Sequence, residues 1–245
     1  MSSQKILTGF HAVTSRLRQR PETVTEIYLD AERSDARAKD LRELAKRLNV
    51  RLISADMKRL DGMAAGVRHQ GVIAHAEPLD TPKFIEDVLE AIKEPPLLLI
   101  LDGVQDPHNL GACLRVADGV GAHAVIAPKD RSVGLTTAAV KVASGAAESV
   151  PYIVVTNLAR TMRDLKDKGI WLIGTDDEAR QSIYKTKLEG ALGIVLGAEG
   201  EGLRRLTKET CDLLVSIPML GSVESLNVSV ASGVCLYEAR RQRLK

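Results

Sequence analysis

Apolar and polar positions follow different patterns in the two parts of the chain. Residues 24–29, V-T-E-I-Y-L, alternate in a way that is typical of a strand with one buried face. From Leu97 onward the apolar residues come in continuous runs instead, as in L-L-L-I-L at 97–101. Continuous runs indicate strands buried on both faces, as in a parallel sheet covered by helices. The chain is therefore predicted to be an α/β protein with a parallel sheet in its C-terminal part.

The N-terminal part is predicted to alternate short elements. The expected strands are 24–29, 50–54 and 71–76, and the expected helices are 11–18, 34–48 with Ser34 as N-cap, and 55–60. Residues 77–96 carry two proline signals around one amphipathic helix, with Thr81 as its N-cap and Pro82 at the first helical position. These signals predict a domain at 1–76, a linker at 77–96 and a second domain at 97–245.

The second domain is predicted to alternate buried strands with covering helices. Its expected strands are 97–101, 124–127, 152–155, 171–174, 193–197 and 213–217, and its expected helices are 109–120, 137–147, 158–168 and 226–243. In such sheets ligands bind beyond the carboxyl ends of the strands.

Charge is distributed unevenly between the two parts. Residues 1–76 hold 14 Lys and Arg against 9 Asp and Glu, whereas residues 77–245 hold 20 against 23. The excess of positive charge favours contact between the N-terminal part and a polyanion, although a solvated helix face would give the same count. Aromatic residues make up only 3% of the chain, so binding to nucleic acid would depend on charge and backbone groups rather than on stacking.

Several function classes are disfavoured by composition. No apolar stretch reaches the ~18 residues of a membrane span, and the first residues lack a signal-peptide core, so a cytoplasmic protein is expected. Cys113, Cys211 and Cys235 are odd in number and form no C-x-x-C pair, which predicts reduced thiols and no metal site.

The segment L-G-A-E-G-E-G-L at 196–203 looks at first like a nucleotide-binding loop. Its G-x-x-G-x-G spacing fits neither a dinucleotide site nor a P-loop, and Glu199 and Glu201 would repel a phosphate. The loop therefore suits a ligand without phosphate groups.

Polar residues gather in three segments that each follow a strand: 101–115, 196–203 and 217–234. Each of these residues could have a structural role instead of a functional one. Asn109 and Asn227 are good N-caps, Arg115 could form a surface ion pair, and the glycines could form turns. Since all three segments lie beyond carboxyl ends of predicted parallel strands, they are expected to form one site.

The motifs N-L-G-A-C-L-R, L-G-A-E-G-E-G-L and I-P-M-L-G-S-V-E-S-L-N-V-S-V-A resemble, in this order, the three signatures of the SpoU (TrmH-type) ribose 2′-O-methyltransferases of the SPOUT superfamily. The segments G-F-H-A-V and H-Q-G-V-I-A resemble the L30e-like RNA-binding domain fused to several of these enzymes. The resemblance implies a C-terminal SPOUT domain with a deep trefoil knot, and a small N-terminal L30e-like α/β domain. This architecture is most similar to bacterial enzymes that methylate a guanosine ribose in 23S rRNA during ribosome biogenesis.

The resemblance also implies a cofactor, a partner and roles for individual residues. S-adenosylmethionine is the implied methyl donor, and the family usually forms a homodimer through the knot. The implied catalytic residues are Asn109, Arg115, Glu199, Ser225 and Asn227, and the implied cofactor-binding residues are Leu196, Gly197, Gly202, Ile217, Met219 and Leu226. Asn109 would hold the ribose or Arg115, and Glu199 would orient Arg115 or the helix start.

Arg115 is the residue that the family assigns to activation of the hydroxyl. A guanidinium hardly ever gives up its proton, so Arg115 is either an unusual base or a clamp on the RNA phosphate and hydroxyl. It could serve its own subunit or the pocket of the other.

Other functions stay open at this level. A tRNA substrate is an alternative to rRNA, and a non-catalytic RNA-binding scaffold is an alternative to an enzyme. A NAD-dependent enzyme is disfavoured, because the strand at 97–101 leads into G-V-Q-D-P-H-N-L-G without G-x-G-x-x-G.

Overall fold

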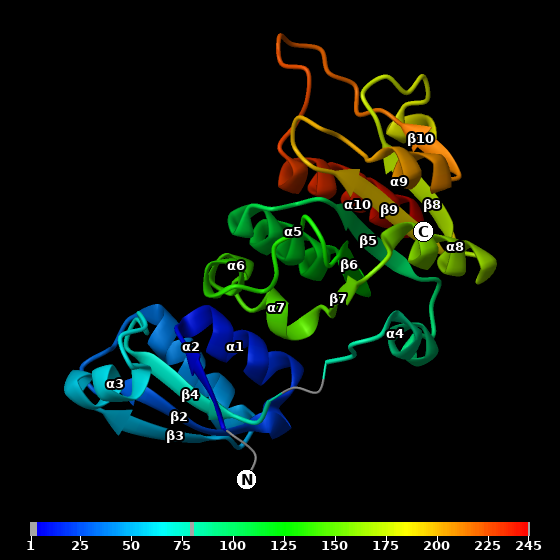
Figure 1. Cartoon of the computed structure of the whole chain (residues 1–245). Helices are drawn as coiled ribbons and strands as arrows, with labels where there is room; N and C mark the ends of the chain where they lie inside the picture. The colour runs from blue at the N-terminus through cyan, green and yellow to red at the C-terminus, as the bar shows by residue number, and fades with distance from the viewer. Residues whose placement is uncertain (1–3, 79–80, 245) are drawn as a thin grey trace. The chain divides into compact units, whose positions relative to one another are not determined.

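The computed structural model describes residues 4–78 and 81–244, and the chain divides at residue 80 into two compact units (Figure 1). Each unit is built around its own sheet and has its own apolar core. Among the described residues no helix is both long and apolar enough to cross a membrane. The same residues contain no group of His, Cys, Asp or Glu side chains arranged to hold a metal ion.

The N-terminal unit contains a mixed four-stranded sheet in the order β1-β4-β2-β3, in which only β2 and β3 are parallel. Helices α1 and α2 pack on one face of the sheet and α3 on the other. The elements are β1 (Lys5–Thr8), α1 (Phe10–Gln19), the 3-10 helix η1 (Pro21–Thr23), β2 (Val24–Asp30), α2 (Ala36–Arg47), β3 (Arg51–Ala55), α3 (Met57–Ala64) and β4 (Val72–Ala76).

Two features of this unit differ from the sequence prediction. Strand β1 was not predicted, because it has only four residues and is defined by its antiparallel pairing with the distant β4. The N-cap of α2 is Asp35 rather than Ser34. The Asp35 carboxylate accepts a hydrogen bond from the backbone N–H of Ala38 at 3.3 Å and is ion-paired with Arg33. An N-cap carboxylate satisfies a helix N–H that has no partner within the helix.

The C-terminal unit contains six strands in the order β10-β8-β9-β5-β6-β7, and every neighbouring pair is parallel. The predicted parallel sheet is confirmed. The strands are β5 (Leu97–Asp102), β6 (Ala124–Pro128), β7 (Tyr152–Val155), β8 (Trp171–Thr175), β9 (Leu192–Gly197) and β10 (Leu213–Val215).

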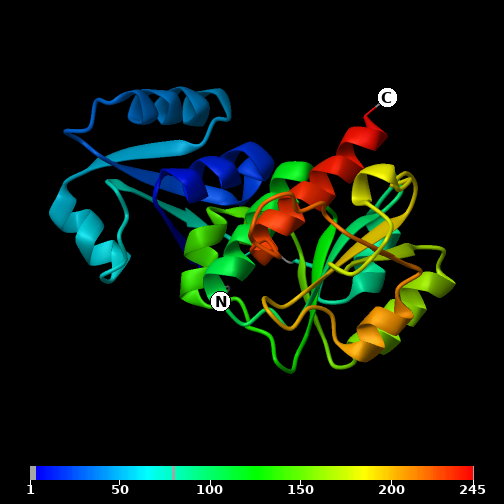
Figure 2. The same cartoon turned by 90° about the horizontal axis from the view of Figure 1, so that it is seen from above.

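Helices cover both faces of this sheet. Leu97 and Leu99 of β5 point into a core shared with α5, α6 and α10, whereas Leu98 and Ile100 point into a core shared with α4 and α8. Figures 1 and 2 show α5 and α10 lying side by side over the sheet. The helices are α4 (Ile85–Ala91), α5 (Pro107–Val120), α6 (Thr137–Ala143), α7 (Ala146–Ser149), α8 (Leu158–Asp167), the 3-10 helix η2 (Ile183–Lys185), α9 (Arg205–Thr210) and α10 (Val228–Arg243).

Two helix predictions for this region need correction, and one short helix was missed. Helix α4 begins at Ile85, with Phe84 in the N-cap position, rather than at Pro82 after Thr81, because its first turn forms where Ile85 enters the core. The predicted helix 137–147 is broken into α6 and α7, since Ser144 and Gly145 both have positive φ, at 52° and 97°. The short helix α9 was not predicted.

Candidate functional site

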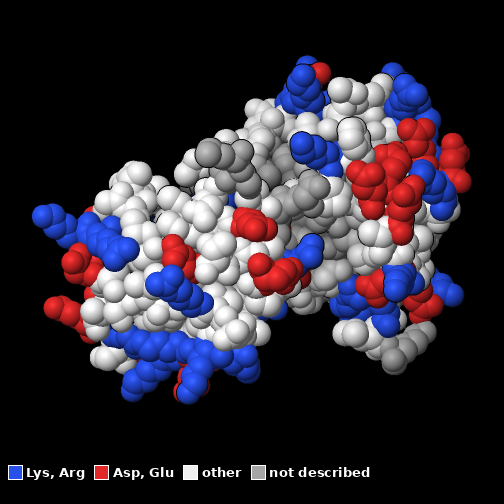
Figure 3. Space-filling model, turned by 90° about the horizontal axis from the view of Figure 1, so that it is seen from below, with Lys and Arg blue, Asp and Glu red and all other residues white. Residues whose placement is uncertain are grey.

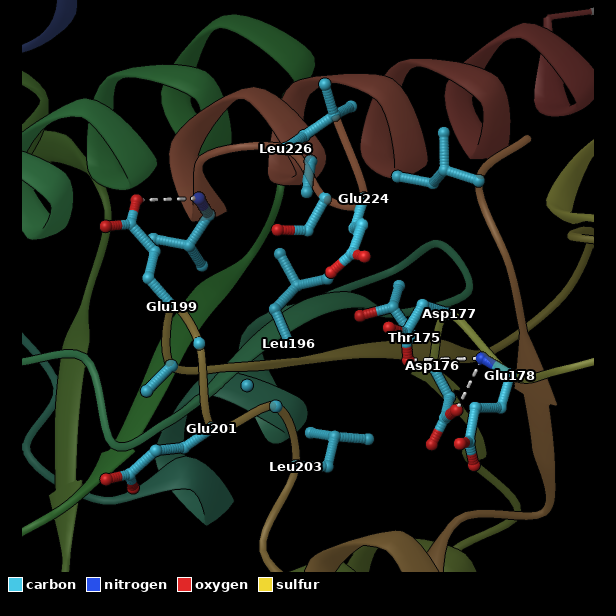
Figure 4. A pocket seen from close by; sticks show the side chains of 18 of the residues that line it. Thr175, Asp176, Asp177, Glu178, Leu196, Glu199, Glu201, Leu203, Glu224 and Leu226 are labelled. Carbon is cyan, nitrogen blue, oxygen red and sulfur yellow. Dashed lines mark hydrogen bonds between the residues drawn. The ribbon is translucent and has the colours of Figure 1, made fainter. Parts of the chain in front are cut away.

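A cavity of about 370 Å³ opens beyond the carboxyl ends of three adjacent strands, β10, β8 and β9 (Figure 4). Three chain segments line it, one after each strand, together with the start of α10 and Lys208 of α9. The lining residues are 175–178, 196–203, Lys208, Ile217, Met219, 224–226, Val228 and Ala231. The second and third polar segments identified in the sequence therefore share one cavity.

The structure brings all the predicted cofactor-binding residues to this cavity. Its walls include Leu196, Gly197, Gly202, Ile217, Met219 and Leu226. Of the predicted catalytic residues, Glu199 and Ser225 also line it, whereas Asn109 and Asn227 lie beside it through hydrogen bonds to Glu199. The individual roles of these residues stay predictions.

The structure requires glycine at 197 for a different reason than at 200 and 202. A Cβ atom on Gly197 would lie 2.1 Å from the carbonyl carbon of Gly202 and 2.4 Å from the nitrogen of Leu203, so no side chain fits there. Gly200 and Gly202 have φ of 79° and 64°, which only glycine adopts without strain. The loop therefore folds tightly on itself, with the N–H of Gly202 donating to the carbonyl of Ala198 at 3.0 Å.

Glu199 connects the three sequence motifs. Its Oε1 atom accepts hydrogen bonds from Nδ2 of Asn109 at 3.3 Å, from Nδ2 of Asn227, and from the backbone N–H of Val228 at 3.4 Å. Nδ2 of Asn227 also donates to Oδ1 of Asn109 at 2.9 Å. Figure 4 shows Glu199 turned towards the start of α10 and Glu201 pointing away from it. A carboxylate in this place also suits the positive end of the α10 dipole.

Helices α5 and α10 start differently from each other at this site. Asn227 is the N-cap of α10, since its Oδ1 accepts from the N–H of Ser229 at 2.9 Å, in agreement with the sequence, where Asn227 is a good N-cap. Asn109 is not the N-cap of α5. That position belongs to Asp106, whose carboxylate accepts from the N–H of His108 at 2.8 Å, and this bond lowers the pKa of Asp106. Asn109 thus lies in the first turn with its side chain free to reach Glu199.

Arg115 lies further along α5 and is exposed to solvent. It forms neither a hydrogen bond nor an ion pair within residues 4–78 and 81–244. Of the two orienting roles predicted for Glu199, the structure shows its contact with the start of α10 and none with Arg115.

The sequence prediction missed an ion pair between the buried Asp102 and the partly exposed Arg204, which directly follows the glycine loop. Asp102, fully buried at the end of β5, accepts from the backbone N–H of Arg204 at 3.0 Å and from its Nε at 2.6 Å. Removing Arg204 would leave the buried Asp102 carboxylate without its charge partner. A polar residue at the end of a wholly apolar strand was the available signal.

The segment 175–178 after β8 was also missed, although it follows a strand in the same way as the other two. It brings Asp176, Asp177 and Glu178 to the cavity, where Glu224 also lies. Asp176 is ion-paired with Lys208, and this contact raises the pKa of Lys208. Carboxylates outnumber cations around the cavity, which favours a cationic ligand over a phosphate ester.

Comparison with known proteins gives two family matches that cover most of the chain. Residues 96–237 match the SpoU rRNA Methylase family, and residues 6–82 match the RNA 2′-O ribose methyltransferase substrate binding family. The chain is 63% identical over 243 residues to a 23S rRNA (guanosine-2′-O-)-methyltransferase RlmB of Ralstonia nicotianae, covering 99% of this chain and 98% of that protein.

Two solved structures are similar over almost the whole chain. An RNA 2′-O ribose methyltransferase has a TM-score of 0.75 and 26% identity, covering 100% of this chain and 90% of that one. The SpoU methyltransferase AviRb from Streptomyces viridochromogenes, in complex with the cofactor AdoMet, has a TM-score of 0.73 and 24% identity, covering 98% and 91%.

Proposed function

We propose, since this chain belongs to the SpoU rRNA methylase family, that it methylates the ribose 2′-hydroxyl of a guanosine in 23S rRNA. The observation that carries the proposal is the convergence of the three motifs on one site. Glu199 binds Asn109 and Asn227 at the edge of a cavity where a donor and a ribose can meet. Holding two reactants in line supplies much of the catalysis in such a transfer.

S-adenosylmethionine fits the cavity as methyl donor on three observations. The cavity has room for a small organic molecule, its backbone is exposed at Gly200 and Gly202, and its charge favours a cation. When bound, the donor supplies a methyl group activated by its sulfonium. The loop at 196–203 and residues Ile217, Met219 and Leu226 would hold it.

The proton of the 2′-hydroxyl must leave as the oxygen attacks, and Arg115 is the cation assigned to this step. A guanidinium keeps its proton in proteins, so we assign Arg115 the role of a clamp that orients the RNA, with a neighbouring group or water receiving the proton. Asn109, fixed by Glu199 and Asn227, would position the ribose.

The Arg115→Lys variant tests the clamp. Lysine keeps the charge but loses the planar fork, so we expect kcat/KM to fall about 10- to 100-fold at every pH. The measurement is methyl transfer to rRNA from pH 6 to 10. Activity that rises with pH towards the wild-type value would indicate a base instead.

The main experiment is to incubate the protein with S-adenosylmethionine and undermethylated 23S rRNA and to map 2′-O-methylation by nucleotide. One methylated guanosine is expected with the wild type, and a large loss with Asn109→Ala that leaves donor binding in calorimetry intact. A protein that binds rRNA but neither binds nor uses the donor would be the scaffold. Methylation of tRNA alone would identify the alternative substrate.

The N-terminal unit is proposed to be an L30e-like domain that binds the RNA. Figure 3 shows a band of Lys and Arg along one face of this unit, in keeping with its excess of positive charge. When Lys and Arg side chains bind RNA phosphates, the affinity for RNA falls steeply as the salt concentration rises. The enzyme would act in the cytoplasm, where its rRNA substrate is assembled into ribosomes.

We also propose that the chain is a homodimer through its C-terminal unit. Val230 and Tyr237 lie two turns apart on α10 and are 51% and 53% exposed, which leaves an apolar stripe available for a second copy. Sedimentation should give twice the chain mass, and Tyr237→Glu should give monomers with greatly reduced activity. A fully active monomer would contradict the dimer.

The deep trefoil knot is proposed for the segment that follows β9. The chain leaves β9 in the middle of the sheet, forms β10 at its edge, and returns through residues 216–227 to α10, which packs on α5 and β9. Stretching the chain from both ends with optical tweezers should leave it shorter than a fully extended chain of the same length if a knot tightens.

A further inference from the structure

We propose that Arg131, in the loop 129–136 that follows β6, holds a phosphate of the RNA substrate beside the catalytic site. This inference rests on the proposed function and adds a positioning residue that lies outside the three motifs. Strand β6 is the neighbour of β5 on the side away from β9, so this loop emerges at the same carboxyl edge of the sheet as the site.

Contacts at Gly103 bring this loop close to the cavity loop. A Cβ atom on Gly103 would lie 3.6 Å from Cβ of Ala198 and 3.9 Å from the carbonyl oxygen of Arg131. One glycine, directly after β5, is therefore flanked by the cavity loop and by the backbone of Arg131. Asn109, which follows β5, and Glu199, which follows β9, lie at the same edge of the sheet, so an RNA ribose held there would bring neighbouring phosphates to the side of the site where Arg131 lies.

Three hydrogen bonds hold the loop in place. The N–H of Lys129 donates to the carbonyl of Val155 at 2.7 Å, and the N–H of Val133 donates to the carbonyl of Val104 at 2.9 Å. The hydroxyl of Tyr152 donates to the carbonyl of Val133 at 2.7 Å. Because the backbone is fixed on both sides of Arg131, its guanidinium is presented from a defined point.

The backbone of Arg131 is unusual. Its φ is 58°, in the left-handed region that a side chain with a Cβ atom rarely occupies. Strained residues that persist in a well-anchored loop are a reason to look for a function.

The side chain of Arg131 is available to a ligand. Arg131 is exposed and, across the part of the chain that the structure describes, forms neither an ion pair nor a hydrogen bond. The cavity beside it is rich in carboxylates, which repel an RNA backbone, so a free cation at this edge has a clear electrostatic role. A guanidinium binds a phosphate through two parallel hydrogen bonds.

The test compares Arg131→Gln with Arg163→Gln in the full-length protein. Arg163 is an exposed arginine on α8 and is the matched control. For Arg131→Gln we expect KM for 23S rRNA to rise about tenfold with kcat within about twofold, and the slope of log K against log salt to become shallower by about one. Arg131→Lys should recover part of the affinity. Donor binding in calorimetry should be unchanged in all variants.

The outcomes separate this inference from the proposed function. If the wild type methylates rRNA and Arg131→Gln has an unchanged KM and salt slope, the inference is wrong and the function stands. If Arg131→Gln lowers kcat and donor binding as well as raising KM, Arg131 has a structural role, and this result would also overturn the inference. If the wild type neither binds nor methylates rRNA, the proposed function fails and the inference fails with it.

Discussion

At the scale of single residues, the site depends on the two different ends of one amide side chain. Nδ2 of Asn227 donates to Glu199 and Asn109, while its Oδ1 accepts from the N–H of Ser229. Aspartate has nearly the same shape and is an equally good N-cap, but it has no donor. An Asn227→Asp substitution can therefore keep the N-cap of α10 while it removes the two hydrogen bonds that Nδ2 donates to Glu199 and Asn109.

Asn227→Asp is expected to lower the free energy of unfolding at pH 7 by about 1–3 kcal/mol and to reduce methyl transfer at least tenfold. The new carboxylate would face Glu199, so one of the two would have a raised pKa in the folded state. A raised pKa adds stability at low pH that is lost as the pH rises, and the deficit should therefore be smaller at pH 5 than at pH 7. Urea unfolding at both pH values measures this.

Asn157→Asp is the matched control. Asn157 caps α8 by accepting from the N–H of Arg160 at 3.0 Å, and its cap can be kept by a carboxylate. We expect Asn157→Asp to change the free energy of unfolding by no more than about 0.5 kcal/mol, because a negative charge at the start of α8 interacts favourably with the helix dipole. Equal destabilisation by both substitutions would mean that the Asn227–Glu199 contact contributes nothing specific.

At the scale of elements, α5 is held between α6 and α10 through small residues. Gly111 of α5 lies directly against α6, and a Cβ atom there would be 2.5 Å from the carbonyl oxygen of Ala139. Gly233 of α10 faces α5 with more room, since its nearest neighbour would be a methyl of Val116 at 4.0 Å. Two helical glycines thus have opposite packing environments.

Gly111→Ala should destabilise the protein by about 1–3 kcal/mol through overpacking, because backbone of α6 would have to move. Gly233→Ala should instead stabilise it by about 0.5–1 kcal/mol, since alanine reduces the flexibility of the unfolded chain and its methyl group fits. Urea unfolding of both variants checks the pair. A neutral Gly111→Ala would show that α5 and α6 are not in rigid contact.

At the scale of the whole molecule, burial decides the chemistry of the cysteines. All three thiols are free, and Cys113 and Cys235 are buried in the core between the C-terminal sheet and its helices. Burial raises the pKa of Cys113 to about 11 and that of Cys235 to about 12. Because thiols with such pKa values stay protonated at neutral pH, Cys113 and Cys235 act as apolar packing groups.

Stability is expected to fall as the pH rises above about 9. A thiol in the unfolded chain ionises near its ordinary pKa, while the same thiol in the core stays protonated up to about 11 or 12. Between these values each buried thiol lowers the free energy of unfolding by up to about 1.4 kcal/mol per pH unit. Urea unfolding from pH 8 to 11 should show a shallower decline in a Cys113→Ala, Cys235→Ala double variant. If the stability of the wild type and of the double variant declines equally with pH, other titrating groups cause the effect.

The order of elements could be read from the sequence because buried strands and amphipathic helices have local periodicities. Short elements could not, since β1 depends on pairing with β4 and α9 has only six residues. The break between α6 and α7 was also not predicted, although Gly145, which directly follows Ser144 and has a positive φ, was an available local signal. The start of α2 differed because the Asp35 side chain, not that of Ser34, caps the helix, and α4 starts at Ile85, which is buried in the core.

By itself the sequence determined the class of the fold, the parallel sheet and the three motifs that identify the family. These properties are local, because they are carried by apolar period, by turn residues and by short motifs. Only the tertiary structure decided that Glu199 binds Asn109 and Asn227, that Asp102 holds Arg204, and that Arg131 lies across Gly103 from the cavity loop. The hydrogen-bonded partners are 28, 90 and 102 residues apart in the chain. Only the packing of the parallel strands brings the segments that follow them to one edge of the sheet.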